Sequence, residues 1–176
     1  MTKVETIYFV EGECEKNFIN SFKASREIIS GKVRITNLWE TANITKVIRL
    51  LPKEKAIIFV VFDTDVISEI ERFRANVKSL SKHARKIVLL PQHGHFEDEI
   101  AFACSKLATK NLPMHLYGLQ TMSECKTKLA QDNNLVNNLR PKGFELSMMW
   151  SRAEIVERLN LSVKNLHWGI EHVLMD

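Results

Sequence analysis

The most hydrophobic stretch of the chain runs from Ile57 to Phe62 and ends in Asp63-Thr64-Asp65. Its unbroken series of β-branched and aromatic residues predicts a strand that is buried on both faces, as the central strands of parallel sheets are. In open α/β sheets the ligand crevice lies outside the carboxyl ends of the strands. The pattern therefore places Asp63 and Asp65 where a protein of this class usually carries out its chemistry.

Strand and helix patterns alternate along the first hundred residues. Further strands are predicted at 4–10, 32–38 and 86–91, and helices at 13–22, 43–51 and 68–81, where apolar residues recur at helical spacing. Strands that alternate with helices in this way indicate a parallel, right-handed arrangement. We therefore expect an α/β fold with a mostly parallel, Rossmann-like sheet flanked by helices.

The chain beyond residue 107 has weaker patterns. Helices are predicted at 122–130, at 151–159 behind the capping-box pattern of Ser151 and Glu154, and at 162–174. Residues 133–149 suggest a loop with one uncertain strand. We expect residues 1–110 to form the α/β core and residues 111–176 to form a mainly helical extension packed on it. Trp150 and Trp168 fit core or edge packing better than stacking on bases.

Carboxylates follow two of the predicted strands. A single aspartate at the end of a strand is ordinarily a helix N-cap, but Asp63 and Asp65 together repel, and a divalent cation allows both to stay ionised. Glu11 follows the first strand, and Gly12 permits a tight turn into a helix. Glu15 lies one turn further and either faces the same crevice or is an ordinary acid at a helix N-terminus.

A second group of polar residues follows the predicted strand at 86–91. In extended chain, His93, His95 and Glu97 would lie on one side and could form a transition-metal site. The alternative is that the imidazoles form hydrogen bonds or face a substrate. Phe96 and the apolar residues after it fit a helix anchored in the core.

Composition restricts the class of protein more than its activity. The 176 residues are 45% hydrophobic and 26% charged, which is typical of a globular protein and excludes a disordered or fibrous chain. We expect no signal peptide and no membrane span. Cys14, Cys104 and Cys125 form no CxxC pair, and this usage fits a reducing cytoplasm.

The formal net charge of +4 is compatible with a nucleic-acid partner. Lys82 and Arg85 form one basic cluster with their neighbours, and Arg140 and Lys142 form another. Such clusters would hold a phosphodiester backbone beside an acidic, metal-binding crevice. The alternative is that they are solvated helix faces.

Three separated pieces together resemble a known family. They are the VEGxxE stretch at 10–15, Asp63-Thr64-Asp65 after the central strand, and Phe96-Glu97-Asp98. Their order is similar to that of the Toprim domain, the metal-dependent fold of topoisomerases, primases and several nucleases. Over residues 4–105 the chain most resembles the small bacterial RloB-like and OLD-like Toprim nucleases, which are often linked to phage defence.

The resemblance implies roles for the acids. Glu11 would act in general acid/base catalysis or join the metal site, and Asp63 and Asp65 would bind Mg²⁺ or Mn²⁺, while Glu15 and Glu97 would be ligands of a second metal. The implied activity is metal-dependent hydrolysis of DNA or RNA, in which metal polarises the phosphoryl oxygens. The histidines before Phe96 depart from the family pattern. An ATPase of the OLD kind would be a separate polypeptide.

Two other functions compete with this hypothesis. Asp63-Thr64-Asp65-Val66 also fits the nucleophile motif of haloacid-dehalogenase-like phosphatases, in which Asp63 would be the nucleophile and Asp65 the general acid. That motif lies mid-chain here, and no later acidic motif of that family follows. The other competitor is a non-catalytic module that binds nucleic acid or a partner protein.

Overall fold

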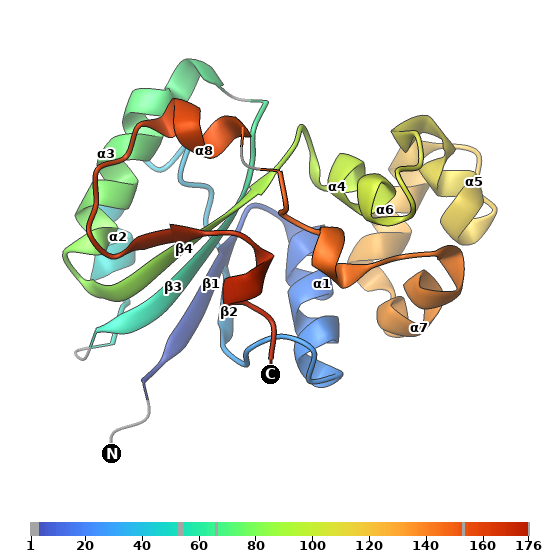
Figure 1. Ribbon diagram of the computed structural model, residues 1–176, viewed down its shortest axis with the longest axis horizontal. Coiled ribbons are helices and arrows are strands. Elements are labelled where there is room, and N and C mark those ends of the chain that lie inside the picture. Colours follow the sequence, from blue (N-terminus) through green and yellow to red (C-terminus); the bar gives the residue numbers. More distant parts are fainter. Residues whose placement is uncertain (1–3, 53–54, 66, 153, 176) are drawn as a thin grey trace.

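The protein is an α/β sandwich built on one five-stranded sheet, and every pair of neighbouring strands is parallel. The computed structural model (Figure 1) describes residues 4–52, 55–65, 67–152 and 154–175. The strand order is β2-β1-β3-β4-β5. Helices flank the sheet, so the predicted Rossmann-like fold class is confirmed. The strands are β1 (Thr6–Val10), β2 (Lys32–Ile35), β3 (Ala56–Asp63), β4 (Ala84–Gln92) and β5 (Leu166–Trp168).

The predicted central strand is the central strand of the sheet. β3 pairs with β1 on one side and with β4 on the other. In this register Asp63 lies opposite Gln92, and Phe9 lies opposite Val60. The side chains from Ile58 to Phe62 are at most 1% exposed, because the sheet is covered on both faces. The carboxyl ends of β1, β3 and β4 therefore meet at one edge of the sheet.

The strand order reverses between β1 and β3. The chain leaves β1 for β2 on one side of this point and continues through β3 and β4 on the other side. This reversal is the topological switch point, where the connections after two adjacent strands diverge to opposite faces and leave room for a ligand. Glu11 follows β1 and Asp63 ends β3, so both acids border this switch point.

The two faces of the sheet carry different helices (Figure 1). One face packs against α2 (Ile44–Ile48), α3 (Ile70–Ser81) and α8 (Glu154–Leu159), with Trp39 and Phe73 stacked in its core. The other packs against α1 (Glu13–Ala24) around Phe18 and Phe22. Further helices follow on the α1 side, namely α4 (Phe96–Ala103), α5 (Leu112–Tyr117), α6 (Met122–Gln131) and α7 (Leu135–Leu139).

The predicted helix at 162–174 is wrong. This segment contains β5 and a single 3₁₀ turn, Ile170–His172, separated by Gly169 with φ +100°. Leu166 packs on the α3 face of the sheet, whereas Ile170 and Val173 pack on the α1 face. The apolar residues are spaced as they would be on one face of a helix. They are instead buried in two different cores, because the chain crosses from one face of the sheet to the other. The extension after residue 110 is helical up to Leu159 and then returns to the sheet.

The expected loop and strand at 133–149 are also mostly helical. α7 buries Leu135, Val136 and Leu139 against the α1 side, and 3₁₀ turns follow at Arg140–Lys142 and Leu146–Met148. An isolated bridge pairs Phe144 with Cys104 in place of a strand. The capping box expected at Ser151 and Glu154 lies partly outside the described residues, and the Ser151 hydroxyl donates to the Met148 carbonyl at 2.8 Å.

Trp150 and Trp168 lie in the core and on an edge strand, as expected. Trp150 is fully buried in the core, and Trp168 is 37% exposed on the edge strand. All three cysteines are free thiols. In the described part of the chain, no helix has the length and apolar character needed to cross a membrane.

Candidate metal centre

Asp63, Asp65 and His95 come together at the carboxyl edge of the sheet. One potential ligand atom from each lies within 4.8 Å of the other two. His95 Nδ1 is 3.5 Å from Asp63 Oδ2 and 3.6 Å from Asp65 Oδ2. Asp63 ends β3 and is mostly buried, whereas Asp65 and His95 are exposed on the loops that follow β3 and β4. Two carboxylates and one imidazole thus converge from adjacent strands.

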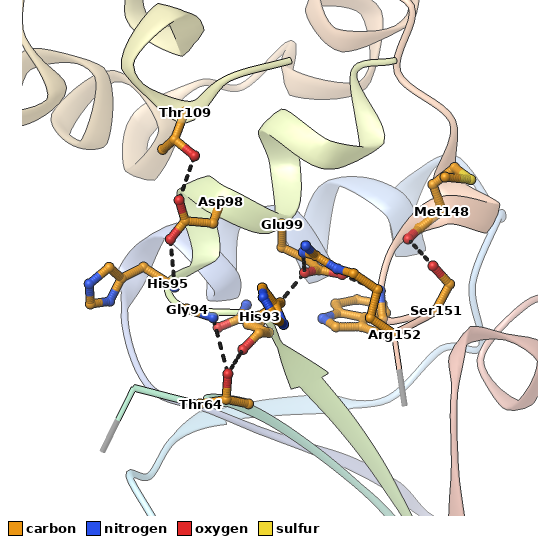
Figure 2. Close-up of polar contacts among 12 residues, drawn as sticks. Thr64, His93, Gly94, His95, Asp98, Glu99, Thr109, Met148, Ser151 and Arg152 are labelled. Atoms are coloured by element: carbon orange, nitrogen blue, oxygen red, sulfur yellow. Dashed lines mark hydrogen bonds and ion pairs between the residues drawn. The ribbon is translucent and has the colours of Figure 1, made fainter. Parts of the chain in front are cut away.

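Thr64 connects the two loops that carry these ligands (Figure 2). Its hydroxyl donates to the Gln92 carbonyl at 2.7 Å and accepts from the Gly94 amide at 3.0 Å. The Thr64 amide donates to the Gly94 carbonyl at 3.1 Å. Gly94 has φ +83°, and a Cβ there would lie 2.6 Å from an Asp98 carboxylate oxygen. Only glycine fits this turn without strain, and the turn places His95 opposite Asp63 and Asp65.

Glu11 and Glu15 lie beside this group in a more buried setting. Burial, reinforced by the charges of Asp63 and Glu15, raises the pKa of Glu11 from 4.5 to about 8. Burial likewise raises the pKa of Glu15 to about 7. Gly12 makes room for Glu15, because a Cβ at Gly12 would lie only 3.1 Å from the Glu15 carboxylate. Both glutamates are at the predicted edge, outside the group formed by Asp63, Asp65 and His95.

Asp63 has a perturbed pKa of its own. Burial raises the pKa of Asp63 from 3.8 to about 6, although the nearby His95 imidazole acts in the opposite direction. The charges of Asp65 and Glu97 raise it further. Raised pKa values on clustered carboxyl groups mean that ionising all of them is unfavourable in the protein alone. A bound cation would remove that penalty.

Glu97 is paired with a lysine from the helical extension. The Glu97 carboxylate is 6% exposed and lies 3.0 Å from Lys126 Nζ, on α6. Burial lowers the pKa of Lys126, but the Glu97 carboxylate outweighs it and the net shift is upward. α6 is held on α1 by the Asn17 side chain, which donates to the Leu129 and Asp132 carbonyls at 2.7 and 3.0 Å. The extension thus contributes a fixed positive charge at the acidic edge.

The residues present fit a divalent cation. Glu11 Oε1 and Asp63 Oδ1 are buried oxygens without a hydrogen-bond partner among the described residues. Buried acceptors are normally satisfied, and a cation at the crevice would supply the missing contact. Carboxylate oxygens suit hard cations and an imidazole nitrogen suits transition metals, so Asp63, Asp65 and His95 together could hold a metal ion.

Sequence reasoning missed the part that His95 and Lys126 play. The sequence pattern groups His95 with His93 and Glu97, but the structure separates these three side chains. His95 turns to the aspartates, Glu97 turns to Lys126, and His93 lines a neighbouring cavity. The chain bends into α4 at Phe96, so the extended spacing does not apply. The usable signal for His95 was its position three residues after a strand adjacent to β3.

The four basic residues predicted to bind nucleic acid do not lie at the acidic edge. Lys82 and Arg85 flank the first residue of β4, at the opposite end of a nine-residue strand. Arg140 pairs at 2.8 Å with Glu27, which follows the far end of α1. Lys142 is exposed at the end of the 3₁₀ turn that begins with Arg140. The prediction that these clusters border the crevice is therefore wrong.

Comparison of the chain with protein-family models, with curated proteins and with solved structures finds no match. A fold of this kind supports many unrelated activities, so the function has to be argued from the site itself.

Proposed function

We propose that the protein is a divalent-metal-dependent phosphodiesterase that hydrolyses DNA or RNA, and that it is a Toprim-type nuclease of the RloB-like and OLD-like kind. The observation that carries the proposal is the convergence of Asp63, Asp65 and His95 at the carboxyl edge of the sheet, one strand from its switch point. The order of the VEGxxE and Asp-Thr-Asp motifs supports it. A role in phage defence and a separate ATPase partner belong to the same proposal.

The residues of the edge have distinct roles in such a reaction. Asp63, Asp65 and His95 would hold Mn²⁺ or Mg²⁺, and the ion would supply polarisation of a phosphoryl oxygen and a lower pKa of bound water. Glu11 is the proton carrier, because its carboxyl lies beside Asp63 at the same edge without belonging to the group of three ligands. Glu15 and Glu97 keep the crevice negative, and Lys126 limits the repulsion among them.

The experiment is cleavage of single- and double-stranded DNA and RNA with Mn²⁺ or Mg²⁺, by wild type and by Asp65→Asn. Asp65 is 40% exposed on a loop, so its amide variant should fold normally. We expect wild type to cut, and chelator and Asp65→Asn each to abolish cutting. Glu13→Gln is the matched control, because Glu13 lies at the start of α1 but is 61% exposed and pairs with Lys16.

The competing functions give different results in the same assay. A small phosphomonoester that is hydrolysed while nucleic acid remains intact would identify a phosphatase instead. If both nucleic acids stay uncut although Mn²⁺ binds to wild type and not to Asp65→Asn, the hydrolase proposal is refuted in favour of a binding module. Equal cutting by both proteins would show that Asp65 is not part of the active site.

A further inference from the structure

A cavity of about 450 Å³ lies on the other side of the loop that carries His95. Its wall includes His93 and Gly94 from that loop, and Asp98 and Phe102 from α4. The Asp98 carboxylate, which accepts from the His95 amide at 2.9 Å, forms the boundary between the cavity and the metal centre. A volume of this size is within the range of small-ligand sites and admits one nucleotide.

Positively charged or protonatable side chains line most of the polar part of this cavity. They are His93, Lys106 and Arg152, which come from three separate segments of the chain. Lys106 and His93 are exposed, and neither forms an ion pair with any acid in the described ranges. The acid of the wall, Asp98, is already engaged by the His95 amide and the Thr109 hydroxyl. The cavity wall thus includes one lysine, Lys106, that no acid of the described residues pairs.

Arg152 is held in place from two sides. Its guanidinium forms an ion pair with the fully buried Glu99, which also accepts from the His93 amide at 3.1 Å and the Trp150 amide at 2.7 Å (Figure 2). The guanidinium carbon lies 4.1 Å from the centre of the Phe102 ring. Arg152 Nε is buried and has no partner within the described ranges. A planar donor group fixed in this way suits recognition of a phosphate.

Lys106 occupies an unusual backbone conformation. Ser105 and Lys106 both have positive φ, 57° and 60°, although neither is glycine. This conformation is costly for residues with a side chain, and two in succession are rare. The turn that they form ends α4 and leads to Leu107 and Thr109, which also line the cavity. The chain thus adopts a strained turn at the point where Lys106 reaches the wall.

We propose that this cavity binds one nucleotide of the substrate strand by its phosphate, next to the phosphodiester that the metal centre attacks. His93, Lys106 and Arg152 contact the phosphate, and Phe102 and Leu107 contact the sugar or base. The inference rests on the proposed function only for the statement that the nucleotide belongs to a substrate strand. Binding of a phosphate-bearing nucleotide itself needs no catalysis.

The test is calorimetric titration of the full chain with AMP in the presence of chelator, so that the metal centre does not contribute. We expect AMP to bind, adenosine to bind at least about tenfold more weakly, and Lys106→Gln or His93→Gln to weaken AMP by about tenfold, the effect of one charge-assisted hydrogen bond. The matched control is Lys110→Gln, since Lys110 is exposed on the adjacent 3₁₀ turn outside the cavity wall. Arg152 stays intact in these variants because its removal would leave Glu99 buried without a counter-charge.

The outcomes separate this proposal from the hydrolase proposal. Asp65→Asn should bind AMP as wild type does, whether or not it cuts nucleic acid. Equal binding of AMP and adenosine, or unchanged AMP binding by both Lys106→Gln and His93→Gln, overturns the phosphate site. An oligonucleotide with a 5′-phosphate should compete with AMP better than its 5′-hydroxyl counterpart. If only the free nucleotide binds, the assignment to a substrate strand is overturned.

Discussion

Replacing Glu11 by glutamine should stabilise the metal-free protein, and only at high pH. At pH 4 the Glu11 carboxyl is mostly protonated in both the native and the unfolded state, so the substitution changes little. Between pH 4.5 and about 8 the unfolded chain releases this proton and the native protein retains it. The native state therefore loses stability as the pH rises, and the loss is complete above pH 8.

The size of the effect follows from the pKa of Glu11. At about 1.4 kcal/mol per pKa unit, a rise from 4.5 to about 8 corresponds to an upper bound on the order of 5 kcal/mol. Glu15 and Asp63 share the same repulsion and relax when one charge is removed, so we expect a gain of about 1–3 kcal/mol at pH 9. For a chain of this length that is a rise in Tm of about 5 °C.

The assay is thermal unfolding of wild type and Glu11→Gln with chelator, at pH 4, 7 and 9. The Tm difference should be close to zero at pH 4 and should grow through pH 7 to its full value at pH 9. Glu13→Gln, on the exposed side of the same helix start, should show no such growth. A Tm difference that is equal at pH 4 and pH 9, or a loss of stability at pH 9, would refute the buried, mutually repelling carboxyl cluster.

Two further predictions concern the neighbours of this cluster. His95→Asn should weaken Mn²⁺ binding by at least about tenfold and Mg²⁺ binding much less, because an imidazole nitrogen favours Mn²⁺ over Mg²⁺. Titration calorimetry measures both affinities, and equal losses for the two ions would contradict ligation by His95. Lys126→Met should lower the free energy of unfolding at pH 8 by about 1–2 kcal/mol, because the buried Glu97 carboxylate loses its counter-charge. The loss is not larger because Lys126 is half exposed and water screens the ion pair. Adding Glu97→Gln to that variant should restore the stability, and an unchanged Tm in Lys126→Met alone would show that the ion pair contributes nothing.

The sequence alone determined the core of the sheet and the place of its acids. A strand whose residues are all apolar is stable only when both of its faces are buried. Residues 57–62 therefore had to form a central strand. Parallel strands end at a common edge, so acids that follow β1 and β3 had to share that edge. These two arguments are local, and they located Glu11, Asp63 and Asp65 without knowledge of the strand order.

Only the tertiary structure decided which other side chains reach that edge. Lys126 is more than a hundred residues from Glu11, and it arrives there because α6 packs on α1. His95 reaches the aspartates because Thr64 fixes the loop after β4. Lys82 and Arg85 lie in a basic cluster of the sequence but at the amino end of β4.

The apolar spacing at 162–174 misled for a related reason. The spacing of apolar residues indicates which residues are buried, but it does not indicate whether one core or two cores bury them. Leu166 and Ile170 serve opposite faces of the sheet, and that division exists only once β5 has paired with β4. Patterns along the chain thus fix local structure and burial, whereas contacts between distant segments depend on how the elements pack.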